Sequence, residues 1–327
     1  MYPRRMPRAE ELRIRAGDAT LAATLLLPDD PADGGRYPNV LLLPSWLPRD
    51  RDGNYDRSGH PDWFAADVRG AQPGLLRRLA EALASQGVAS LRADPRGCGE
   101  SDGAWEEVTL FAKIDDARDQ LAAIRSRSEL DLRRSGIIGH GDGAGIGLAV
   151  AIGDPAISAL TLIGASARSW RDTLRRAAAA RGRDGTEHDH PIVAAIDRWS
   201  EDLIERAERR ETNLRLPLSG GGAVTLALAP IEQAIHTPPL ALATMLHRSV
   251  ALVHGTADTW SDPEESGLLE AALQAAGEEP GRRLVPGAGH DLAEASDEVI
   301  GEVAADLAVR LLPRELPPVL LAIEEMG

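Results

Sequence analysis

The sequence predicts an α/β fold with a mostly parallel central sheet, helices on both faces and an inserted cap. Short apolar runs alternate with helical stretches as far as residue 163, and the alternation resumes at residue 250. Between them, residues 166–248 break the pattern. A Gly-rich turn at 137–145 joins an apolar run directly to a helical stretch. Strands that alternate with helices favour a parallel sheet, because the helices serve as its crossover connections.

The first half of the chain supplies most of the predicted sheet. Apolar runs bounded by turn residues predict strands at 12–14, 21–27, 39–43, 88–93, 135–139 and 159–163. Apolar residues at helical spacing predict helices at 73–86, 110–127 and 143–152. Residues 44–72 form a long loop rich in Pro, Gly, Asp and Arg, and loops of that length are usually functional.

Residues 166–248, which interrupt the alternation of strands and helices, predict a cap inserted near the end of the sheet. It is expected to begin with two charged helices, at 168–181 and 191–211. A hairpin that turns at three glycines follows at 214–228, and then a mostly helical stretch at 230–246. The alternation then resumes with strands at 250–254 and 282–285, and with helices at 263–276 and 291–312. We therefore expect a core domain of residues 1–165 and 249–327 and a cap of residues 166–248.

Composition excludes several classes of protein. A net charge of −15 and a pI near 5.0 argue against nucleic acid and membrane surfaces as partners, and no run reaches the roughly 18 apolar residues of a membrane span. The single Cys98 excludes an internal disulfide and fits a cytoplasmic protein without a structural metal. No cofactor motif is visible, so a small-molecule substrate is expected. The apolar tail at 316–323 would either dock in a homodimer or cover its own chain.

The Gly-rich turn carries the most information. Residues 137–145 read Ile-Ile-Gly-His-Gly-Asp-Gly-Ala-Gly, which has the shape of the nucleophile elbow G-x-S-x-G. Gly139 and Gly143 take the flanking glycine positions, and Gly141 stands where the serine would be. The alternative is a Gly-rich turn that binds phosphate at the start of the helix. A dinucleotide fingerprint is disfavoured, because it would follow an N-terminal strand rather than lie in mid-chain.

Two downstream loops supply the other members of a catalytic triad. Asp258 follows the strand at 250–254, and His290 lies in a Gly-rich loop between a strand and a helix. Functional groups gather at the carboxyl ends of parallel strands, and the order elbow, Asp, His is the one this kind of fold uses. Asp258 would hold the His290 imidazole in one tautomer and stabilise its protonated form.

Two further loops allow a resemblance to be named. Residues 41–54 read Leu-Leu-Leu-Pro-Ser-Trp-Leu-Pro-Arg-Asp-Arg-Asp-Gly-Asn, and residues 94–101 read Asp-Pro-Arg-Gly-Cys-Gly-Glu-Ser. Over residues 10–165 and 249–312 the chain resembles the α/β-hydrolase superfamily, especially its serine esterase and dienelactone-hydrolase-like branch. The resemblance implies an α/β-hydrolase fold and an oxyanion hole formed by the backbone N–H groups of Trp46 and Asp142.

The chain departs from that family at two points. Gly141 removes the nucleophile, through natural change or an engineered knockout. Ser45, Trp46 and Leu47 stand where the family usually has Gly-Ser-Gly, which places bulk beside the catalytic centre. Asp142 is a poor substitute nucleophile, because it lies one residue too late and its side chain is expected to turn away or cap the helix.

The remaining candidates concern the pocket and metals. His140 and His254 are expected to be structural, and a metal site at His188, Asp189 and His190 is less favoured than a solvated loop. The residues expected to line the pocket are Ser45, Leu47, Trp170, Trp199, His236 and Trp260.

The leading prediction is an enzyme without a covalent intermediate. His290 and Asp258 would act as the base in a Michael-type addition, elimination, cyclisation or C–C bond formation on an apolar or aromatic small molecule. A chain with one lysine, many arginines and abundant alanine suggests a GC-rich bacterium, in which secondary metabolism recruits such enzymes. The alternatives are an esterase, thioesterase or lactone hydrolase that uses water activated by His290, and an inactive binding or scaffold protein.

Overall fold

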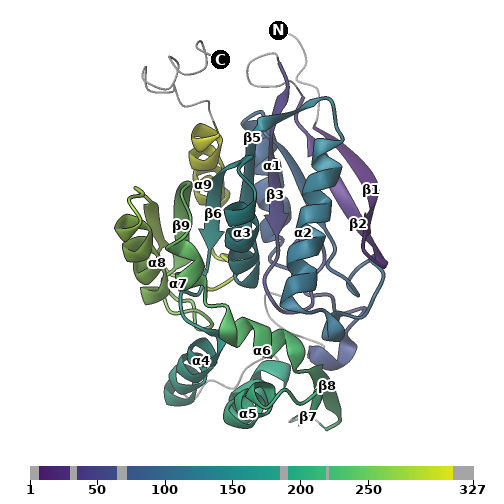
Figure 1. Cartoon of the computed structure of the whole chain (residues 1–327), viewed down its shortest axis with the longest axis vertical. Coiled ribbons are helices and arrows are strands. Elements are labelled where there is room, and N and C mark those ends of the chain that lie inside the picture. The colour runs from purple at the N-terminus through teal and green to yellow at the C-terminus, as the bar shows by residue number, and fades with distance from the viewer. Residues whose placement is uncertain (1–6, 30–34, 65–71, 185–190, 219–220, 312–327) are drawn as a thin grey trace.

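A central eight-stranded sheet organises the chain, in the order β1-β2-β4-β3-β5-β6-β9-β10 (Figure 1). The computed structural model describes residues 7–29, 35–64, 72–184, 191–218 and 221–311. The strands of the sheet are β1 (Arg8–Ala16), β2 (Ala19–Leu27), β3 (Tyr37–Leu43), β4 (Ala89–Ala93), β5 (Leu130–His140), β6 (Ile157–Ile163), β9 (Ser249–Gly255) and β10 (Gly281–Val285). The β1–β2 and β2–β4 pairs are antiparallel, and all other neighbours in the sheet are parallel. The predicted mostly parallel sheet is confirmed.

Helices cover both faces of this sheet and create two apolar cores (Figure 1). One face carries α1 (Leu75–Ser85) and α9 (Asp297–Arg310), and the other carries α2 (Leu110–Arg125), α3 (Asp142–Gly153), α7 (Pro239–Ala243) and α8 (Glu264–Ala275). Alternate residues of a strand point to opposite faces. On β3, Val40 and Leu42 therefore pack in the α1–α9 core, whereas Leu41 and Leu43 pack in the α2–α3 core.

The elements between β6 and α7 gather beyond one end of the sheet (Figure 1). They are α4 (Trp170–Asp184), α5 (Pro191–Glu208), β7 (Asn213–Pro217), β8 (Ala223–Ala227) and α6 (Ala229–His236), followed by α7. Their apolar side chains form a third cluster with Trp46, Trp63 and Trp105. Trp63 lies in the 3-10 helix η1 (Pro61–Trp63) and Trp105 in η2 (Trp105–Glu107). The inserted segment thus covers the loops that follow β3 and β4.

The main difference from the predicted elements is the start of the last helix. It begins at Asp297, whereas the sequence analysis expected residue 291. Leu292 has a positive φ of 49°, which breaks the helical path, and the Ser296 hydroxyl caps the helix by accepting from the N–H of Val299. Residues 291–296 instead form turns that carry the segment next to His290.

Two expectations fall outside the described residues, namely the docking tail at 316–323 and the His188–His190 loop. In the part of the chain that the structure describes, no helix combines the length and apolar character that crossing a bilayer requires.

Candidate active site

Gly141 forms the tip of the tight turn between β5 and α3. Its φ and ψ are 53° and −115°, a conformation that strains any residue with a side chain. Its N–H donates to the carbonyl of Ile163 at 2.8 Å. The two flanking glycines are required by close backbone contacts: a Cβ on Gly139 would lie 2.3 Å from the carbonyl oxygen of Gly143, and one on Gly143 would lie 2.5 Å from that of Leu43. The turn therefore has the strand-to-helix shape predicted for it.

Asp258 and His290 meet beside this turn. Nδ1 of His290 lies 2.8 Å from Oδ2 of Asp258. The other carboxylate oxygen accepts the backbone N–H groups of Trp260 at 2.8 Å and Ser261 at 2.9 Å. Because both oxygens are engaged, the carboxylate is fixed in the orientation that receives Nδ1–H and leaves Nε2 free to accept a proton.

A second histidine supports the same carboxylate. Nε2 of His254 lies 3.2 Å from Oδ2 of Asp258 and 2.7 Å from the carbonyl oxygen of Ser261, and its side chain is fully buried. The sequence analysis expected His254 to be structural, and nothing in the spacing of the chain indicated its contact with Asp258.

The other nitrogen of His290 faces Ser45. Ser45 Oγ lies 3.1 Å from His290 Nε2, and the two residues are 245 positions apart. Ser45 follows β3 and is buried, with 8% of its surface exposed. A Cβ on Gly141 would lie only 2.2 Å from Ser45 Oγ and 2.8 Å from His290 Nε2. The Ser45 hydroxyl therefore fills the space that a side chain at position 141 would need, a contact that the sequence analysis missed.

The charges around His290 set its protonation behaviour. Burial disfavours the imidazolium, but the carboxylate of Asp258 outweighs it and raises the pKa of His290 above 6.5. Burial also opposes the charge on Asp258, yet His290 and His254 lower the pKa of that carboxyl well below its usual range. The arrangement therefore favours proton acceptance by His290 while Asp258 stays ionised.

His140 supports the loop that carries the base. Its Nε2 donates to the backbone carbonyl of His290 at 3.0 Å, and the two rings lie 4.7 Å apart. Burial and the neighbouring His290 lower the pKa of His140 to about 3. A neutral imidazole that donates to the main chain fits the structural role expected for His140.

The two predicted oxyanion donors, the backbone N–H groups of Trp46 and Asp142, directly follow Ser45 and Gly141 in the chain. Asp142 is the first residue of α3, where a backbone N–H has no partner within the helix. Neither this N–H nor that of Trp46 donates to a protein acceptor among the described residues. The Asp142 carboxylate turns away and pairs with Lys113 Nζ at 3.0 Å. Both N–H groups therefore remain available to a ligand.

Tryptophans form the wall of the site. The Trp46 ring packs against three others, with centroid separations of 4.8 Å to Trp170, 5.6 Å to Trp105 and 6.0 Å to Trp260. Trp46 lines two adjoining cavities of about 50 Å³ each. One includes Ser45, and the other includes Gly141, His290, Trp170 and Trp260.

Three residues expected in the pocket lie elsewhere. Leu47 is buried in the third apolar cluster and lines neither cavity. Trp199 lies on α5 with 39% of its surface exposed. His236 ends α6 with its side chain 60% exposed, 3.8 Å from Glu232. Helical periodicity could not determine which face of each cap helix turns toward the site.

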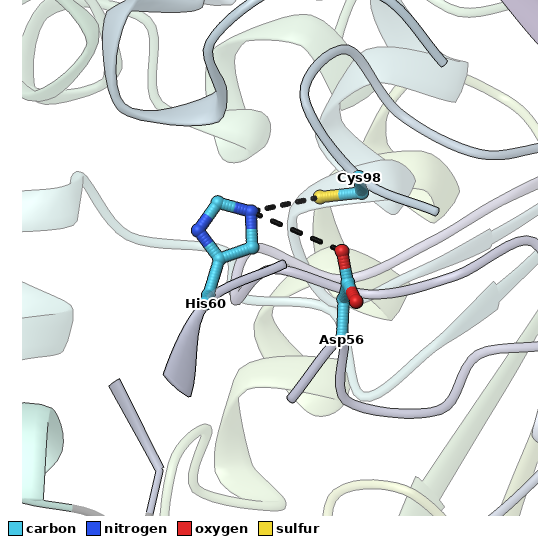
Figure 2. Close-up of side chains that lie close together, drawn as sticks. All are labelled: Asp56, His60 and Cys98. Atoms are coloured by element: carbon cyan, nitrogen blue, oxygen red, sulfur yellow. Dashed lines mark hydrogen bonds and ion pairs between the residues drawn. The ribbon is translucent and has the colours of Figure 1, made fainter. Parts of the chain in front are cut away.

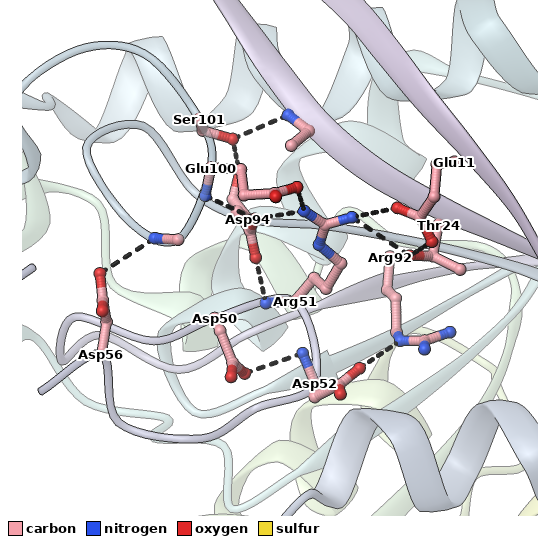
Figure 3. Close-up of polar contacts among 12 residues, drawn as sticks. Glu11, Thr24, Asp50, Arg51, Asp52, Asp56, Arg92, Asp94, Glu100 and Ser101 are labelled. Carbon is pink, nitrogen blue, oxygen red and sulfur yellow. Dashed lines mark hydrogen bonds and ion pairs between the residues drawn. The ribbon is translucent and has the colours of Figure 1, made fainter. Parts of the chain in front are cut away.

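An ionic network anchors the loop after β3 to its surroundings (Figure 3). The Arg51 guanidinium pairs with Asp94 and Glu100, each at 2.7 Å, and its backbone N–H donates to Asp94 at 2.6 Å. Asp52 pairs with Arg92 at 2.8 Å. These contacts explain Arg51 and Asp52, because each ties this loop to β4 or to the loop that follows it.

A second cluster, Asp56, His60 and Cys98, has the composition of a metal site (Figure 2). His60 Nε2 lies 3.8 Å from Cys98 Sγ and 4.0 Å from Asp56 Oδ2, but it donates to the carbonyl of Gly97 at 2.9 Å. Its Nδ1 faces Glu106 at 3.3 Å. Burial raises the pKa of the Cys98 thiol, which favours its protonated form. With both ring nitrogens engaged and the thiol protonated, this arrangement joins two loops rather than presenting free ligands.

Comparisons with known proteins agree with the fold. One similar solved structure is Est1E from Butyrivibrio proteoclasticus with bound ferulic acid, at a TM-score of 0.63 and 17% identity; the match covers 93% of this chain and 100% of that one. Another is DcsB in complex with its substrate analogue, at a TM-score of 0.63 and 18% identity; the match covers 94% of this chain and 100% of that one. The acylaminoacyl peptidase of Pyrococcus horikoshii is also similar, at a TM-score of 0.64 and 15% identity; the match covers 98% of this chain and 44% of that one. Identities this low show the fold alone.

No curated protein sequence matches the chain. The pattern of the family described as serine aminopeptidase, S33, matches residues 69–297, which is more than half of the chain. The chain therefore belongs to the serine aminopeptidase S33 family, within the α/β-hydrolase superfamily.

Proposed function

We propose that this protein is an enzyme that acts on the carbonyl group of an ester, thioester or lactone, with His290 as the general base. One observation carries the proposal: the His290 imidazole lies between the Asp258 carboxylate, at 2.8 Å, and a hydroxyl group, at 3.1 Å, at the wall of a cavity. A base held in this way typically contributes about 10²–10⁴-fold to the rate. Membership of a hydrolase family supports the same reaction class.

The cavity wall favours an aromatic or apolar acyl group. Trp46, Trp170 and Trp260 offer ring faces and edges to a ligand, and such surfaces bind flat apolar groups well. The similar Est1E structure holds ferulic acid, an aromatic acid. The free N–H groups of Trp46 and Asp142 would stabilise the negative charge that develops on the carbonyl oxygen.

The second candidate is the non-hydrolytic reaction that the sequence analysis favoured. The observation in its favour is that Gly141 carries no side chain at the tip of the turn, while His290 and the two N–H groups remain in place. His290 would then remove a proton next to a carbonyl, and the N–H groups would stabilise the resulting enolate. The product would be an addition, elimination, cyclisation or C–C coupling on an apolar ring system.

Replacement of His290 tests both candidates. We expect His290→Ala to lower turnover of p-nitrophenyl and thioester substrates with aromatic acyl groups by about 10²–10⁴-fold. The matched control is His247→Ala, because the His247 side chain is 68% exposed and lies outside the cavities. Ester turnover that survives His290→Ala would reject the proposal. Deuterium exchange into the acyl α-carbon without hydrolysis, dependent on His290, would favour the second candidate.

A further inference from the structure

We propose that Ser45 is the nucleophile of this enzyme and takes the place of the absent serine at the elbow. The inference rests on the proposed function, since it needs His290 as its base. Ser45 Oγ, His290 and Asp258 form a continuous chain of contacts, at 3.1 Å between Oγ and Nε2 and 2.8 Å between Nδ1 and Oδ2. This is the connectivity of a Ser-His-Asp triad, with the serine supplied by another loop.

The strand register explains why Ser45 can reach this position. β3 and β5 are parallel neighbours, and Leu43 pairs with Gly139 in their register. Ser45 and Gly141 each lie two residues beyond that pair, so the two loops leave the sheet side by side. A Cβ on Gly141 would approach Ser45 Oγ to 2.2 Å. The two positions therefore compete for one space beside His290, and glycine at one of them makes room for serine at the other.

The loop that carries Ser45 is fastened directly to the loop that carries the base. Arg49, four residues after Ser45, pairs through Nη2 with Oδ1 of Asp291 at 2.8 Å, and Asp291 directly follows His290. Tyr55 donates its hydroxyl to the other oxygen of Asp291 at 2.9 Å. The Arg49 side chain is only 2% exposed. A buried ion pair between the two loops holds the hydroxyl and the imidazole together, which a nucleophile requires and a pocket wall does not.

The reaction follows from this arrangement. Ser45 Oγ attacks the substrate carbonyl carbon while His290 Nε2 accepts the hydroxyl proton, and the carbonyl electron pair moves to oxygen. As the tetrahedral intermediate collapses, the bond to the leaving alkoxide or thiolate breaks, and His290 returns the proton to that group. Water then attacks the acyl-Ser45 ester while His290 accepts its proton. As this second tetrahedral intermediate collapses, the bond between the acyl carbon and Ser45 Oγ breaks, His290 returns the proton to Oγ, and the acid is released.

The relocated nucleophile also exchanges the roles of the two oxyanion donors. In the usual arrangement the residue after the nucleophile supplies one backbone N–H and the loop after the third strand supplies the other. Here the residue after the proposed nucleophile is Trp46, and the second donor is Asp142 at the start of α3. The same two N–H groups serve, so the change from an elbow serine to Ser45 needs no new donor.

Covalent labelling tests the proposal. An alkyl fluorophosphonate reacts with an activated serine, whose Oγ bonds to phosphorus as fluoride leaves and the base accepts the proton. We expect the parent protein to be labelled at Ser45, as located by peptide mass mapping. Labelling and ester turnover should fall by at least about 10²-fold in Ser45→Ala and in His290→Ala. Ser126→Ala is the matched control, because Ser126 is exposed at the end of α2 and its hydroxyl donates to the carbonyl of Ala123.

The outcomes separate the two proposals. If Ser45→Ala retains turnover while His290→Ala loses it, water is the nucleophile; Ser45 is rejected and the proposed function stands. If turnover and labelling survive His290→Ala, the proposed function fails. A parent protein that resists the probe, or carries the label elsewhere, overturns the assignment of Ser45. The variant Ser45→Cys provides a second test. Its thiol should react with iodoacetamide faster when His290 is present than in the double variant that also carries His290→Ala.

Discussion

Arg49 and Asp291 form a buried ion pair, 2.8 Å between Nη2 and Oδ1, that joins the loop after β3 to the loop carrying His290. Burial opposes the charge on each residue, but each stabilises the other: Asp291 raises the pKa of Arg49, and Arg49 lowers the pKa of Asp291. The pair is therefore an electrostatic link between the two loops that carry Ser45 and His290.

Removal of one partner should leave a buried charge without compensation. We expect Arg49→Met to lower the free energy of unfolding by about 3–5 kcal/mol, because Asp291 would stay buried and ionised. Urea unfolding at neutral pH measures the change. Arg209→Met is the control: Arg209 is exposed and pairs with Glu205 on the surface of α5 and the turn after it, so little change is expected. Equal, small changes for both variants would show that the buried pair does not hold the loops together.

Exchanging Gly141 and Ser45 together should preserve a reactive serine beside His290, whereas placing serine at position 141 alone should not. Gly141→Ser introduces a side chain at a φ of 53°, at a cost of about 1–3 kcal/mol, and forces Ser45 Oγ away from His290. We expect the single variant to lose labelling at Ser45. The double variant Gly141→Ser, Ser45→Gly should regain labelling, now at position 141, because the space beside the imidazole is vacated.

Gly277→Ser separates strain from competition for space. Gly277 also has a positive φ, 89°, but a Cβ there would meet nothing within 4 Å. We expect a stability loss without any change in labelling. Undiminished labelling of Ser45 in Gly141→Ser would contradict the competition between the two positions.

The charge on Asp258 should control the pH dependence of the reaction. His290 accepts a proton only when neutral, and Asp258 holds its pKa above 6.5, so activity should rise with pH through a value above 6.5. Asp258→Asn removes the largest influence that raises the pKa of His290, while burial continues to lower that pKa. The rise of activity with pH should therefore move to lower pH. The rate should also fall by about 10³–10⁴-fold, because the imidazole loses its fixed tautomer. A pH–rate profile of kcat/KM, which reports the pKa values of the free enzyme, measures both changes, and an unshifted profile would exclude His290 as the titrating base.

The same interaction has a consequence for stability. A pKa that is raised in the folded state stabilises the fold below the ordinary value of 6.5, and this contribution is lost as the pH rises through the folded value. In Asp258→Asn the contribution should disappear, so the difference in unfolding free energy between parent and variant should shrink as the pH rises.

Short-range patterns were enough to predict the strands and most of the helices, and the order of three loops along the chain predicted the Asp258–His290 pair. Gly139 is required by contacts within the turn and Gly141 by its positive φ, whereas Gly143 is required by the close approach of the Leu43 carbonyl; the motif at 139–143 contains all three glycines. The contact between Ser45 and His290 depends instead on the register of β3 against β5 and on the path of two long loops. No spacing in the chain encodes that register, so Ser45 could be predicted as pocket lining but not as a partner of the base.

The cap shows the same limit. The apolar face of α5, which includes Ile192, Ile196 and Leu203, predicts that this helix packs on a neighbour, but the sequence does not say which elements that face meets. Trp170 therefore reached the cavity while Trp199 remained 39% exposed, although both are tryptophans in adjacent cap helices.

Trp46 should limit the size of the acyl group. Its indole packs against three tryptophans and lines both cavities, whereas its contribution to an oxyanion hole is through the backbone N–H. Trp46→Leu keeps that N–H and an apolar wall but frees volume between two spaces of about 50 Å³ each. We expect the ratio of kcat/KM for p-nitrophenyl octanoate to that for the acetate to rise at least about tenfold, a change of about 1.4 kcal/mol. Trp199→Leu, on the exposed side of α5, should leave this ratio unchanged. A ratio that is unaffected by Trp46→Leu, or that shifts equally in both variants, would mean that the acyl group binds away from the tryptophan wall.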